Sequence, residues 1–317
     1  MKILEKNRGR EVSGEYIASR FGVSRALVCK AVKKLRAEGN DISARNNGGY
    51  TLSENSDALS AIGIRERMNK IRQVVYLPET DSTNRQAKLM ALDGAEDGTI
   101  VVTDCQTAGR GRRGRSFFSP AGSGVYFSVI IRPDIDYMQC QKIVPMTAVA
   151  VTRAIESVCG LITGIKWVND IYYNGKKVVG IATETIGELG GLKPDALIVG
   201  IGINVNTDNF PPELKDKAGS LGADINRNLL VAACVDAFFD LYGQLEHGAF
   251  MDEYRKKCFI INKKVEVLGG TRSFYAKATD IDDFGALIVE TEEGEVKKLF
   301  TEEVSIRLDA GQRYTQN

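Results

Sequence analysis

Apolar and polar residues follow three different spacings along this 317-residue chain. The spacing is helical near the start, mixed in the middle, and typical of short strands beyond Asn262. The pattern predicts a multidomain α/β (α+β) protein with one helical domain, one mixed domain and one small β-barrel. The expected divisions are a helix-turn-helix domain at 1–60, a linker at 61–73, a mixed α/β domain at 74–260 and a β-barrel at 261–317.

The N-terminal segment has the pattern of a winged helix-turn-helix. A short helix is expected over 15–21, and Gly22-Val23-Ser24 then supplies a turn in which Ser24 caps a second helix over 25–36. The segment 42–52 alternates and turns at Asn-Gly, as a β-hairpin wing does. The apolar residues of the second helix recur at helical spacing at Leu27, Ala31 and Leu35.

The basic charge of the chain is concentrated in this segment. Residues 1–50 contain eleven Lys or Arg and five Asp or Glu, a net charge of +6, so the remainder carries −5. A basic winged helix is typical of DNA binding, and a helical packing module with a solvated basic face is the alternative. The candidate DNA-contacting residues are Ser24, Arg25, Lys30, Lys33, Lys34 and Arg45.

The most distinctive stretch of the chain is Thr107–Ser116, which lies between strand-like runs at 99–103 and 124–131. Its three glycines let the backbone approach a ligand, and its four arginines supply planar donors suited to phosphate or carboxylate. A connection anchored in a sheet at both ends is able to close over a ligand. We interpret the stretch as a phosphate-handling lid, with a solvated basic turn or a nucleic-acid contact as the alternative.

Polar residues at two further places carry candidate chemistry. Ser82, Thr83 or Asn84 either caps the helix that follows or faces a ligand, and capping is favoured. Lys176 and Lys177 interrupt an apolar strand after the turn at 174–175 of a predicted hairpin. A lysine that faces a buried carboxylate or phosphate explains this placement, and the exposed alternative is assigned to Lys176 rather than Lys177.

The remaining pattern supplies the core. The apolar run 196–206 predicts a central strand in which Gly200 and Gly202 allow close backbone approach. The long loop at 207–222 is a candidate second lid. Helices are expected over 57–68, 140–158, 229–245 and 250–257, and five short strands between 264 and 308.

Several classes of protein are excluded by composition. The six cysteines lack CxxC spacing, which predicts reduced thiols and neither a zinc site nor a disulfide framework. No run approaches the roughly 18 apolar residues of a membrane span, and the start lacks the apolar core of a secretion signal. We therefore expect a cytoplasmic protein without a membrane partner. His247, the single histidine, has no evident partner and is given no catalytic role.

Taken in order, these motifs resemble those of the bifunctional biotin–protein ligase and biotin-operon repressor family, over essentially the whole chain. The DSTN of that family stands at 81–84, its CQTAGRGRRGR at 105–115, and its KWPND at 166–170. Val168 takes the proline position, which is expected to change loop rigidity more than chemistry. The resemblance implies a winged helix, a central ligase domain related to class II aminoacyl-tRNA synthetases, and a C-terminal SH3-like barrel.

The resemblance also implies a role for each site residue. Those implied at biotin are Ser82, Thr83, Asn84, Gln106, Arg110, Gly111, Arg112 and Lys177. Those implied at ATP or the adenylate are Arg112, Arg115, Asn169, Asp170 and Asn204. The candidate catalytic residues are Lys177, which would hold the carboxylate and the α-phosphate, and Arg112 and Arg115, which would close over the adenylate. No protein ligand for a metal is implied, and Mg²⁺ would enter with ATP.

By resemblance, the reaction joins biotin and Mg-ATP into biotinyl-5′-AMP and pyrophosphate. The biotinyl group then passes to a lysine of the biotin carboxyl carrier protein of acetyl-CoA carboxylase. Neither step needs a protein nucleophile, so the side chains have to align two anions and neutralise charge. The implied partners are the carrier protein, operator DNA, and a second copy of the chain when the adenylate is bound.

Three alternatives come from other functional classes. A lipoate–protein ligase would share the fold, but the Arg-Arg-x-Ser-Gly-Gly-Gly segment of that family is absent from the sequence. A small-molecule-sensing transcription factor without enzymatic activity would show no biotin-dependent ATP–pyrophosphate exchange. A ligase whose winged helix no longer binds DNA would show exchange and fail to bind an operator.

Overall fold

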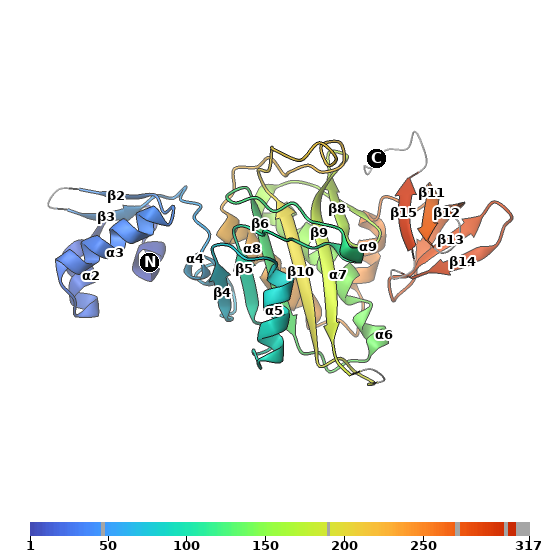
Figure 1. Ribbon diagram of the computed structural model, residues 1–317, viewed down its shortest axis with the longest axis horizontal. Coiled ribbons are helices and arrows are strands. Elements are labelled where there is room, and N and C mark those ends of the chain that lie inside the picture. Colours follow the sequence, from blue (N-terminus) through green and yellow to red (C-terminus); the bar gives the residue numbers. More distant parts are fainter. Residues whose placement is uncertain (46–47, 189–190, 270–272, 301–303, 309–317) are drawn as a thin grey trace.

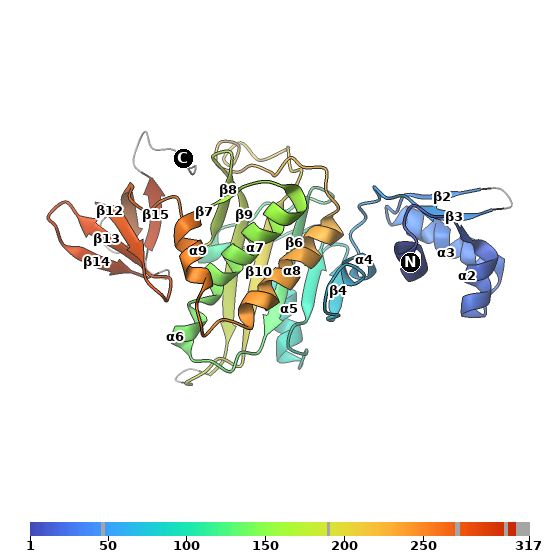
Figure 2. The same cartoon turned by 180° about the vertical axis from the view of Figure 1, so that it is seen from behind.

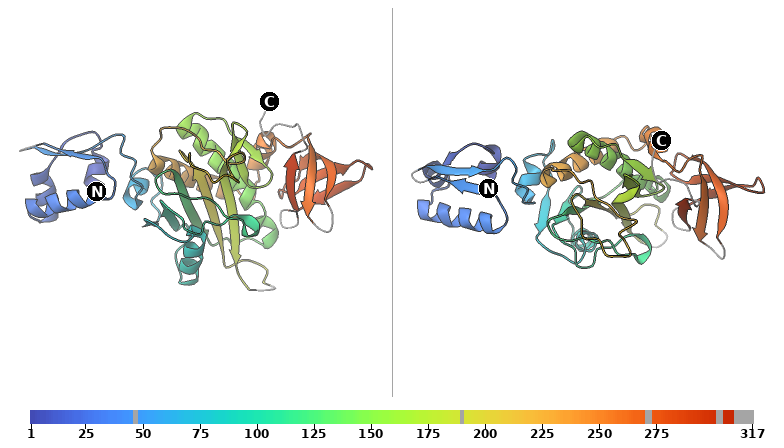
Figure 3. Two further views of the ribbon diagram at one scale, coloured as in Figure 1. Left: turned by 45° about the horizontal axis from the view of Figure 1, so that its top comes forward. Right: turned by 90° about the horizontal axis from the view of Figure 1, so that it is seen from above.

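The computed structural model describes residues 1–45, 48–188, 191–269, 273–300 and 304–308. The chain forms three bodies in a row, with the N-terminal winged domain and the C-terminal sheet at opposite ends of the long axis (Figure 1). The central body, which contains the largest sheet, lies between them in both views of Figure 3. This is the multidomain α/β architecture that the sequence predicts.

The N-terminal body is the predicted winged helix. The Ser24 hydroxyl caps the second helix of the motif by accepting a hydrogen bond from the Leu27 N–H at 3.2 Å. Strand β3 lies between β1 and β2, and the wing turn predicted at Asn-Gly includes residues 46–47, outside the described residues. The elements are α1 (Lys2–Lys6), β1 (Val12–Ser13), α2 (Gly14–Phe21), α3 (Arg25–Ala37), β2 (Ile42–Ala44) and β3 (Gly49–Leu52).

The apolar face of α3 that enters the core is not the one that carries Leu27, Ala31 and Leu35. Val28 and Val32 are 5% and 3% exposed, whereas Leu27 is 51% exposed. Ala31 is also on the surface, and Leu35 is half-buried. Both sets of residues are apolar at i and i+4, so their spacing does not choose between the two faces. The packing of α2 against α3 chooses the valine face.

In the junction between the first two bodies, most of the residues predicted to form a helix are not helical. The helix expected over 57–68 is confined to α4 (Ala61–Arg65). The residues before α4 are held by side chains at the start of α8 instead of by helical hydrogen bonds: Arg227 pairs with Asp57 at 2.5 Å and also with Asp104. Arg227 therefore connects the junction to Asp104, in the segment that leads into the arginine-rich loop.

The central body is a seven-stranded sheet in the order β4-β5-β6-β10-β9-β8-β7. Only β4 and β5 run parallel, and the other neighbours are antiparallel. Its strands are β4 (Val74–Leu77), β5 (Ile100–Thr103), β6 (Gly124–Ile131), β7 (Gly164–Lys166), β8 (Asp170–Tyr173), β9 (Lys176–Ile186) and β10 (Ala196–Asn204). The long strand-like run that contains Gly200 and Gly202 thus becomes β10, at the centre of the sheet.

Helices cover both faces of this sheet. The pair α7 and α8 packs on one face (Figure 2), and α5 lies on the other beside β5, β6 and β10 (Figure 1). Strand β6 is buried along its whole length, as a strand covered on both sides should be. The helices are α5 (Thr83–Leu92), α6 (Tyr137–Cys140), α7 (Ile143–Cys159), α8 (Arg227–Tyr242) and α9 (Phe250–Lys257).

The C-terminal body is an antiparallel sheet in the order β14-β13-β12-β11-β15. Its five strands occupy the segments predicted for the C-terminal barrel. It docks on the central body through a turn, where Trp167 donates its indole N–H to the carbonyl oxygen of Gly285 at 2.9 Å. The strands are β11 (Lys264–Gly269), β12 (Phe274–Ile281), β13 (Leu287–Thr291), β14 (Val296–Leu299) and β15 (Val304–Leu308).

The six cysteines are free thiols. Among the residues that the structure describes, no helix combines the length and apolar character needed to cross a membrane. The same residues contain no group of three or more His, Cys, Asp or Glu side chains that could hold a metal ion.

Candidate functional site

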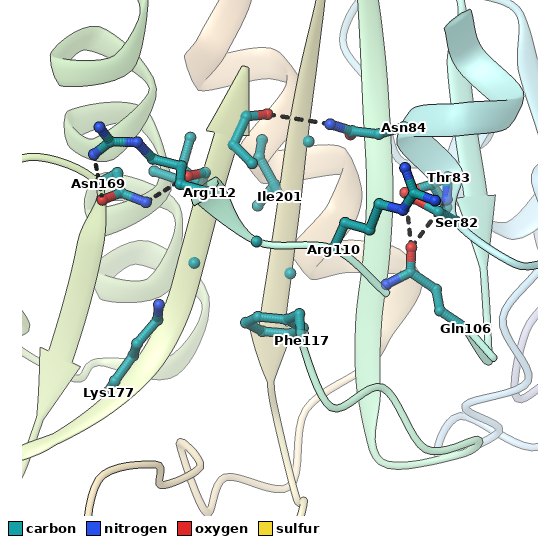
Figure 4. A pocket seen from close by; sticks show the side chains of 16 residues that line it. Ser82, Thr83, Asn84, Gln106, Arg110, Arg112, Phe117, Asn169, Lys177 and Ile201 are labelled. Atoms are coloured by element: carbon teal, nitrogen blue, oxygen red, sulfur yellow. Dashed lines mark hydrogen bonds between the residues drawn. The ribbon is translucent and has the colours of Figure 1, made fainter. Parts of the chain in front are cut away.

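A pocket on the face of the central sheet that carries α5 gathers most of the predicted ligand residues (Figure 4). Its walls come from the start of α5, the arginine-rich loop, the β8–β9 corner and the middle of β10. The lining residues are Ser82, Thr83, Asn84, Gln106, Arg110, Gly111, Arg112, Phe117, Asn169, Lys177, Gly180, Ile181, Ala182, Gly200, Ile201 and Gly202. Nine of the twelve residues that the sequence assigns to biotin or the adenylate are among them.

The other three lie around the pocket. Asp170 forms an ion pair with Lys177, which lines the pocket, and Arg115 is exposed on the loop. Asn204 is 4% exposed and donates its amide to the carbonyl oxygen of Gly219 at 3.0 Å. The Asn204 Oδ1 atom is buried and has no hydrogen-bond partner in the described parts of the chain, and Asn204 is not part of the pocket lining.

The start of α5 does not use the hydroxyl cap that the sequence favours. Ser82 stands at the N-cap position, but its side chain makes no cap hydrogen bond. The Ser82 N–H donates to Asp81 Oδ1 at 2.7 Å, and the Thr83 N–H donates to Gln106 Oε1 at 2.9 Å. The capping role expected of Ser82, Thr83 or Asn84 is therefore wrong, because Asp81 and Gln106 satisfy these donors.

Asp81 anchors this segment from outside the pocket. Its carboxylate accepts hydrogen bonds from the Gln86 side chain at 3.0 Å, from the Ser82 N–H, and from Arg85 at 2.5 Å. These bonds, the one from Gln86 first, lower the pKa of Asp81 to about 2. The carboxylate thus stays charged at neutral pH and holds the backbone from which Ser82 and Thr83 project.

The two adjacent lysines separate as the sequence predicts. Lys176 is exposed and donates to the carbonyl oxygen of Lys215 at 3.0 Å. Lys177 lines the pocket, and its Nζ lies 2.6 Å from Asp170 Oδ1. The ion pair keeps the ammonium group at the pocket wall.

Arg112 lies on the same side of the pocket as Lys177 (Figure 4). Its guanidinium donates to Asn169 Oδ1 at 3.2 Å, and the Asn169 amide donates to the carbonyl oxygen of Ile181 at 2.6 Å. Asn169 therefore fixes Arg112 against β9. The Trp167–Val168 peptide bond, just ahead of Asn169, is cis.

Phe117 forms part of the pocket floor and was not identified from the sequence. Gly180 and Gly202 face each other in the pairing of β9 with β10. A Cβ atom at Gly202 would lie 2.6 Å from the Phe117 ring, and one at Gly180 would lie 2.9 Å from it. The absence of side chains at these two positions therefore provides the space for the ring. The aromatic pair that closes the arginine-rich loop, Phe117-Phe118, was the available signal.

The predicted DNA-contacting residues lie on a different body. They occupy α3, its cap and the position after β2, and all six are exposed: Ser24, Arg25, Lys30, Lys33, Lys34 and Arg45. Their ion pairs with acidic side chains are surface pairs, such as Arg25 with Glu15 at 4.0 Å, which contribute little to stability. The basic face of α3 is therefore open to a polyanion.

Three family models match the chain, one for each body. Residues 76–204 match the biotin/lipoate A/B protein ligase family, residues 1–51 match an HTH domain, and residues 260–307 match the biotin protein ligase C-terminal domain.

Curated relatives and a solved structure are similar over most of their length. The chain is 38% identical to the bifunctional ligase/repressor BirA of Bacillus spizizenii, over 93% of this chain and 94% of that protein. It is 30% identical to the biotin–acetyl-CoA-carboxylase ligase of Paracoccus denitrificans, over 67% of this chain and 92% of that protein. The biotin protein ligase from Aquifex aeolicus in complex with biotin and ATP superposes with a TM-score of 0.64 at 30% identity, over 75% of this chain and all of that one.

Proposed function

Because the chain belongs to the family of bifunctional biotin protein ligases and repressors, we propose that it adenylates biotin with ATP and biotinylates a lysine of a carrier protein. The carrier is the biotin carboxyl carrier protein of acetyl-CoA carboxylase. The chain also represses biotin synthesis or uptake genes in response to biotin, and it works in the cytoplasm. The observation that carries the ligase assignment is one pocket with hydroxyl and amide side chains and Arg110 at one end, here called the neutral end after those groups, and Lys177 and Arg112 at the other.

We assign the three bodies to three tasks. Residues 1–60 bind DNA, 61–73 link the domains, 74–260 form the ligase domain and 261–317 form an SH3-like barrel. The matches of family models to 1–51, 76–204 and 260–307 support this division.

The neutral end of the pocket suits the polar head of biotin. Ser82, Thr83 and Gln106 present hydroxyl and amide groups to it, while Arg110 and Gly111 bring the loop backbone close. The ureido ring carries both N–H donors and a carbonyl acceptor, which these group types are able to pair. The acyl chain then points past the Phe117 ring toward Lys177.

In the first step, a carboxylate oxygen of biotin forms a bond to the α-phosphorus of ATP, and the bond to the pyrophosphate oxygen breaks. The protein has to bring two anions together, so Lys177 and Arg112 hold the carboxylate and the α-phosphate in line. Asp170 orients Lys177, at 2.6 Å, and Asn169 orients Arg112, at 3.2 Å. Arg115 closes over the adenylate, and Asn204 offers its unpartnered oxygen to it.

ATP enters as its Mg²⁺ complex, and bound Mg²⁺ would supply neutralisation of phosphate charge. The oxygen donors near the pocket fit a metal ion held mainly by phosphates and water. They are the Asp170 carboxylate and the buried oxygen of Asn204.

In the second step, the amine of the carrier lysine attacks the carbonyl carbon of the mixed anhydride, and AMP leaves with the electrons of the broken C–O bond. Water would hydrolyse the same anhydride, so the loop 107–116 has to cover it until the carrier protein arrives. A basic loop that covers an anionic adenylate does this through charge as well as shape.

Repression uses the same intermediate. One winged helix makes few phosphate contacts, and each contact contributes a salt slope of only about −0.9, so two copies are needed for selective binding. We assign the homodimer to the adenylate-bound form, which binds a two-fold operator through α3 and the wing. Linkage then requires operator DNA to raise adenylate affinity by the factor that the adenylate adds to operator affinity.

The ligase assignment is tested by ATP–pyrophosphate exchange with biotin, with lipoate, and without either acid. The expected result is exchange that depends on biotin. Exchange with lipoate but not with biotin would identify the protein as a lipoate–protein ligase. No exchange with either acid would leave only the function of a non-enzymatic sensor.

A further inference from the structure

A buried hydroxyl beneath the pocket contacts two of its polar residues. Ser128, in the middle of β6, is fully buried and is not part of the pocket lining. Its Oγ lies 2.7 Å from Asn84 Oδ1 and 2.8 Å from Thr83 Oγ1, so its one hydrogen serves one of these contacts and its lone pairs serve the other. A buried hydroxyl without hydrogen-bond partners would destabilise the fold, so these contacts explain how a serine is accommodated in this apolar strand.

The orientation of the Asn84 amide is fixed from the opposite side. Its Nδ2 lies 3.1 Å from Glu184 Oε1 and 3.4 Å from the carbonyl oxygen of Ala182. Both of these groups are acceptors, so the NH₂ group has to face them and Oδ1 has to face Ser128. Gly200 makes room for this, because a Cβ atom there would overlap Asn84 Oδ1. The protein thus uses both ends of the amide.

Gln106 approaches Thr83 from another side. Gln106 Oε1 lies 2.9 Å from the Thr83 nitrogen and 3.3 Å from Thr83 Oγ1. The backbone N–H is able only to donate, so Gln106 has to present its oxygen to Thr83. On its other side, Gln106 donates to Ser119 Oγ at 2.8 Å, and Ser119 donates to the carbonyl oxygen of Phe117 at 3.0 Å. The orientation of the Gln106 amide is therefore determined.

These two networks meet at Thr83. Asn84 Oδ1 is able only to accept, so Ser128 gives its one hydrogen to Asn84, and the Thr83 hydroxyl gives its own hydrogen to Ser128 Oγ. The lone pairs of Thr83 Oγ1 are then left to face the pocket. We propose that Ser128, held by Asn84 and Glu184, is a positioning residue that fixes Thr83 as a hydrogen-bond acceptor and thereby selects a ligand head that donates an N–H. The inference rests on the proposed biotin ligase function. A ureido ring has such a donor, and a dithiolane ring has none.

The test uses the full chain and a biotin analogue in which one ureido N–H is replaced by a ring oxygen, tested as both possible isomers. Wild type should prefer biotin over the isomer that lacks the N–H facing Thr83 by at least about tenfold in kcat/KM, since facing lone pairs leave a buried acceptor unpaired. In Ser128→Ala, the Thr83 hydrogen loses its acceptor and is able to turn toward the ligand, so this preference should fall several-fold. The KM for ATP should stay unchanged.

Two controls separate this role from a general loss of stability. Thr152→Val removes another fully buried hydroxyl, on α7, which donates only within its own helix, and it should leave the preference unchanged. Glu184→Met, at a half-buried position, frees the Asn84 amide to turn and keeps the test available if Ser128→Ala does not fold. Glu184→Gln retains an acceptor oxygen and should behave as wild type.

A wild-type preference in both Ser128→Ala and Glu184→Met would overturn the inference, and so would an equal loss in the use of biotin and of ATP. A fall in the preference alone supports it. Failure of wild type to show biotin-dependent exchange would instead contradict the proposed function, so the two failures are distinguishable.

Discussion

The two ends of the pocket differ in burial and in pairing. At the neutral end, Ser82, Thr83 and Asn84 are 2%, 4% and 5% exposed, and both ends of the Asn84 amide already have protein partners. At the cationic end, the side chains of Lys177 and Asp170 are 31% and 24% exposed. The polar groups of the neutral end are therefore buried and fixed by protein partners, whereas the charged groups of the cationic end are partly exposed to solvent.

This difference matches the two demands of the proposed reaction. Recognition of a neutral head is improved when each donor and acceptor is fixed before the ligand arrives, because less ordering remains to be done on binding. Charge that develops at the α-phosphate needs cations that are held nearby and strengthened when water leaves. We therefore expect substitutions at the neutral end to change biotin affinity, and substitutions at the cationic end to change the rate.

The largest effect is expected at Lys177. Lys177→Ala should lower the rate of biotin adenylation by at least about 100-fold, the scale of losing one aimed electrostatic donor. Lys176→Ala is the matched control, because that side chain is exposed, and it should change the rate by less than about threefold if surface contacts are as weak as usual. Equal losses in the two variants, measured by pyrophosphate exchange, would contradict the separation of the lysines.

The next effect is expected at the neutral end. Gly200→Ala places a Cβ atom on Asn84 Oδ1, so the amide has to leave its present position. The biotin concentration for half-maximal exchange should rise by about tenfold, the cost of leaving one buried polar group unpaired. Gly243→Ala is the control, because its Cβ would make only ordinary contact at 3.6 Å. A fall in maximal rate without a change in half-saturation would place Asn84 in the chemistry instead.

A smaller effect is expected in the arginine-rich loop. Arg112→Ala or Arg115→Ala should release biotinyl-AMP before transfer, because the lid loses charge that faces the adenylate. We expect release about tenfold faster, visible as biotinylation of bystander lysines in an added protein. Arg20→Ala, on the exposed face of α2, is the control. Wild-type retention of the adenylate in both loop variants would contradict the lid function.

The smallest effect is one of stability with a defined pH dependence. Asp81 has its pKa lowered from 3.8 to about 2, so its bonds stabilise the fold above about pH 4, and this contribution is lost as the pH falls through about 2. Asp81→Asn should lower the midpoint of thermal unfolding at pH 7 by about 2–4 °C. The difference from wild type should vanish near pH 2, and a difference that does not depend on pH would contradict this account.

The comparison also explains what the sequence was able to predict. The cationic end follows from local composition: the arginine-rich loop and the hairpin lysines are unusual wherever they fold, and the exposed place of Lys176 follows from its position beside the turn. The winged helix, the central strand with its glycines and the positions of the C-terminal strands follow from spacing together with local cap and turn residues.

The neutral end depends on contacts between distant segments, which spacing does not determine. Gln106 accepts the hydrogen bond from the Thr83 N–H at the start of α5, and it does so only because the loop folds back to that helix. Ser128 has no distinguishing feature in the sequence, and its role depends on the packing of β6 against α5. Phe117 needs the space above glycines on β9 and β10. The burial of Val28 and Val32 on α3 in place of Leu27 has the same origin, since a second element decides which of two apolar stripes is buried.

The most direct test of the separation between the two ends is biotin-dependent ATP–pyrophosphate exchange, measured against biotin concentration at saturating Mg-ATP. Wild type, Lys177→Ala and Gly200→Ala would be compared in one series. The account predicts that Lys177→Ala mainly lowers the maximal rate and that Gly200→Ala mainly raises the half-saturating concentration of biotin. It is contradicted if wild type shows no biotin-dependent exchange, or if both variants change the same parameter by the same factor.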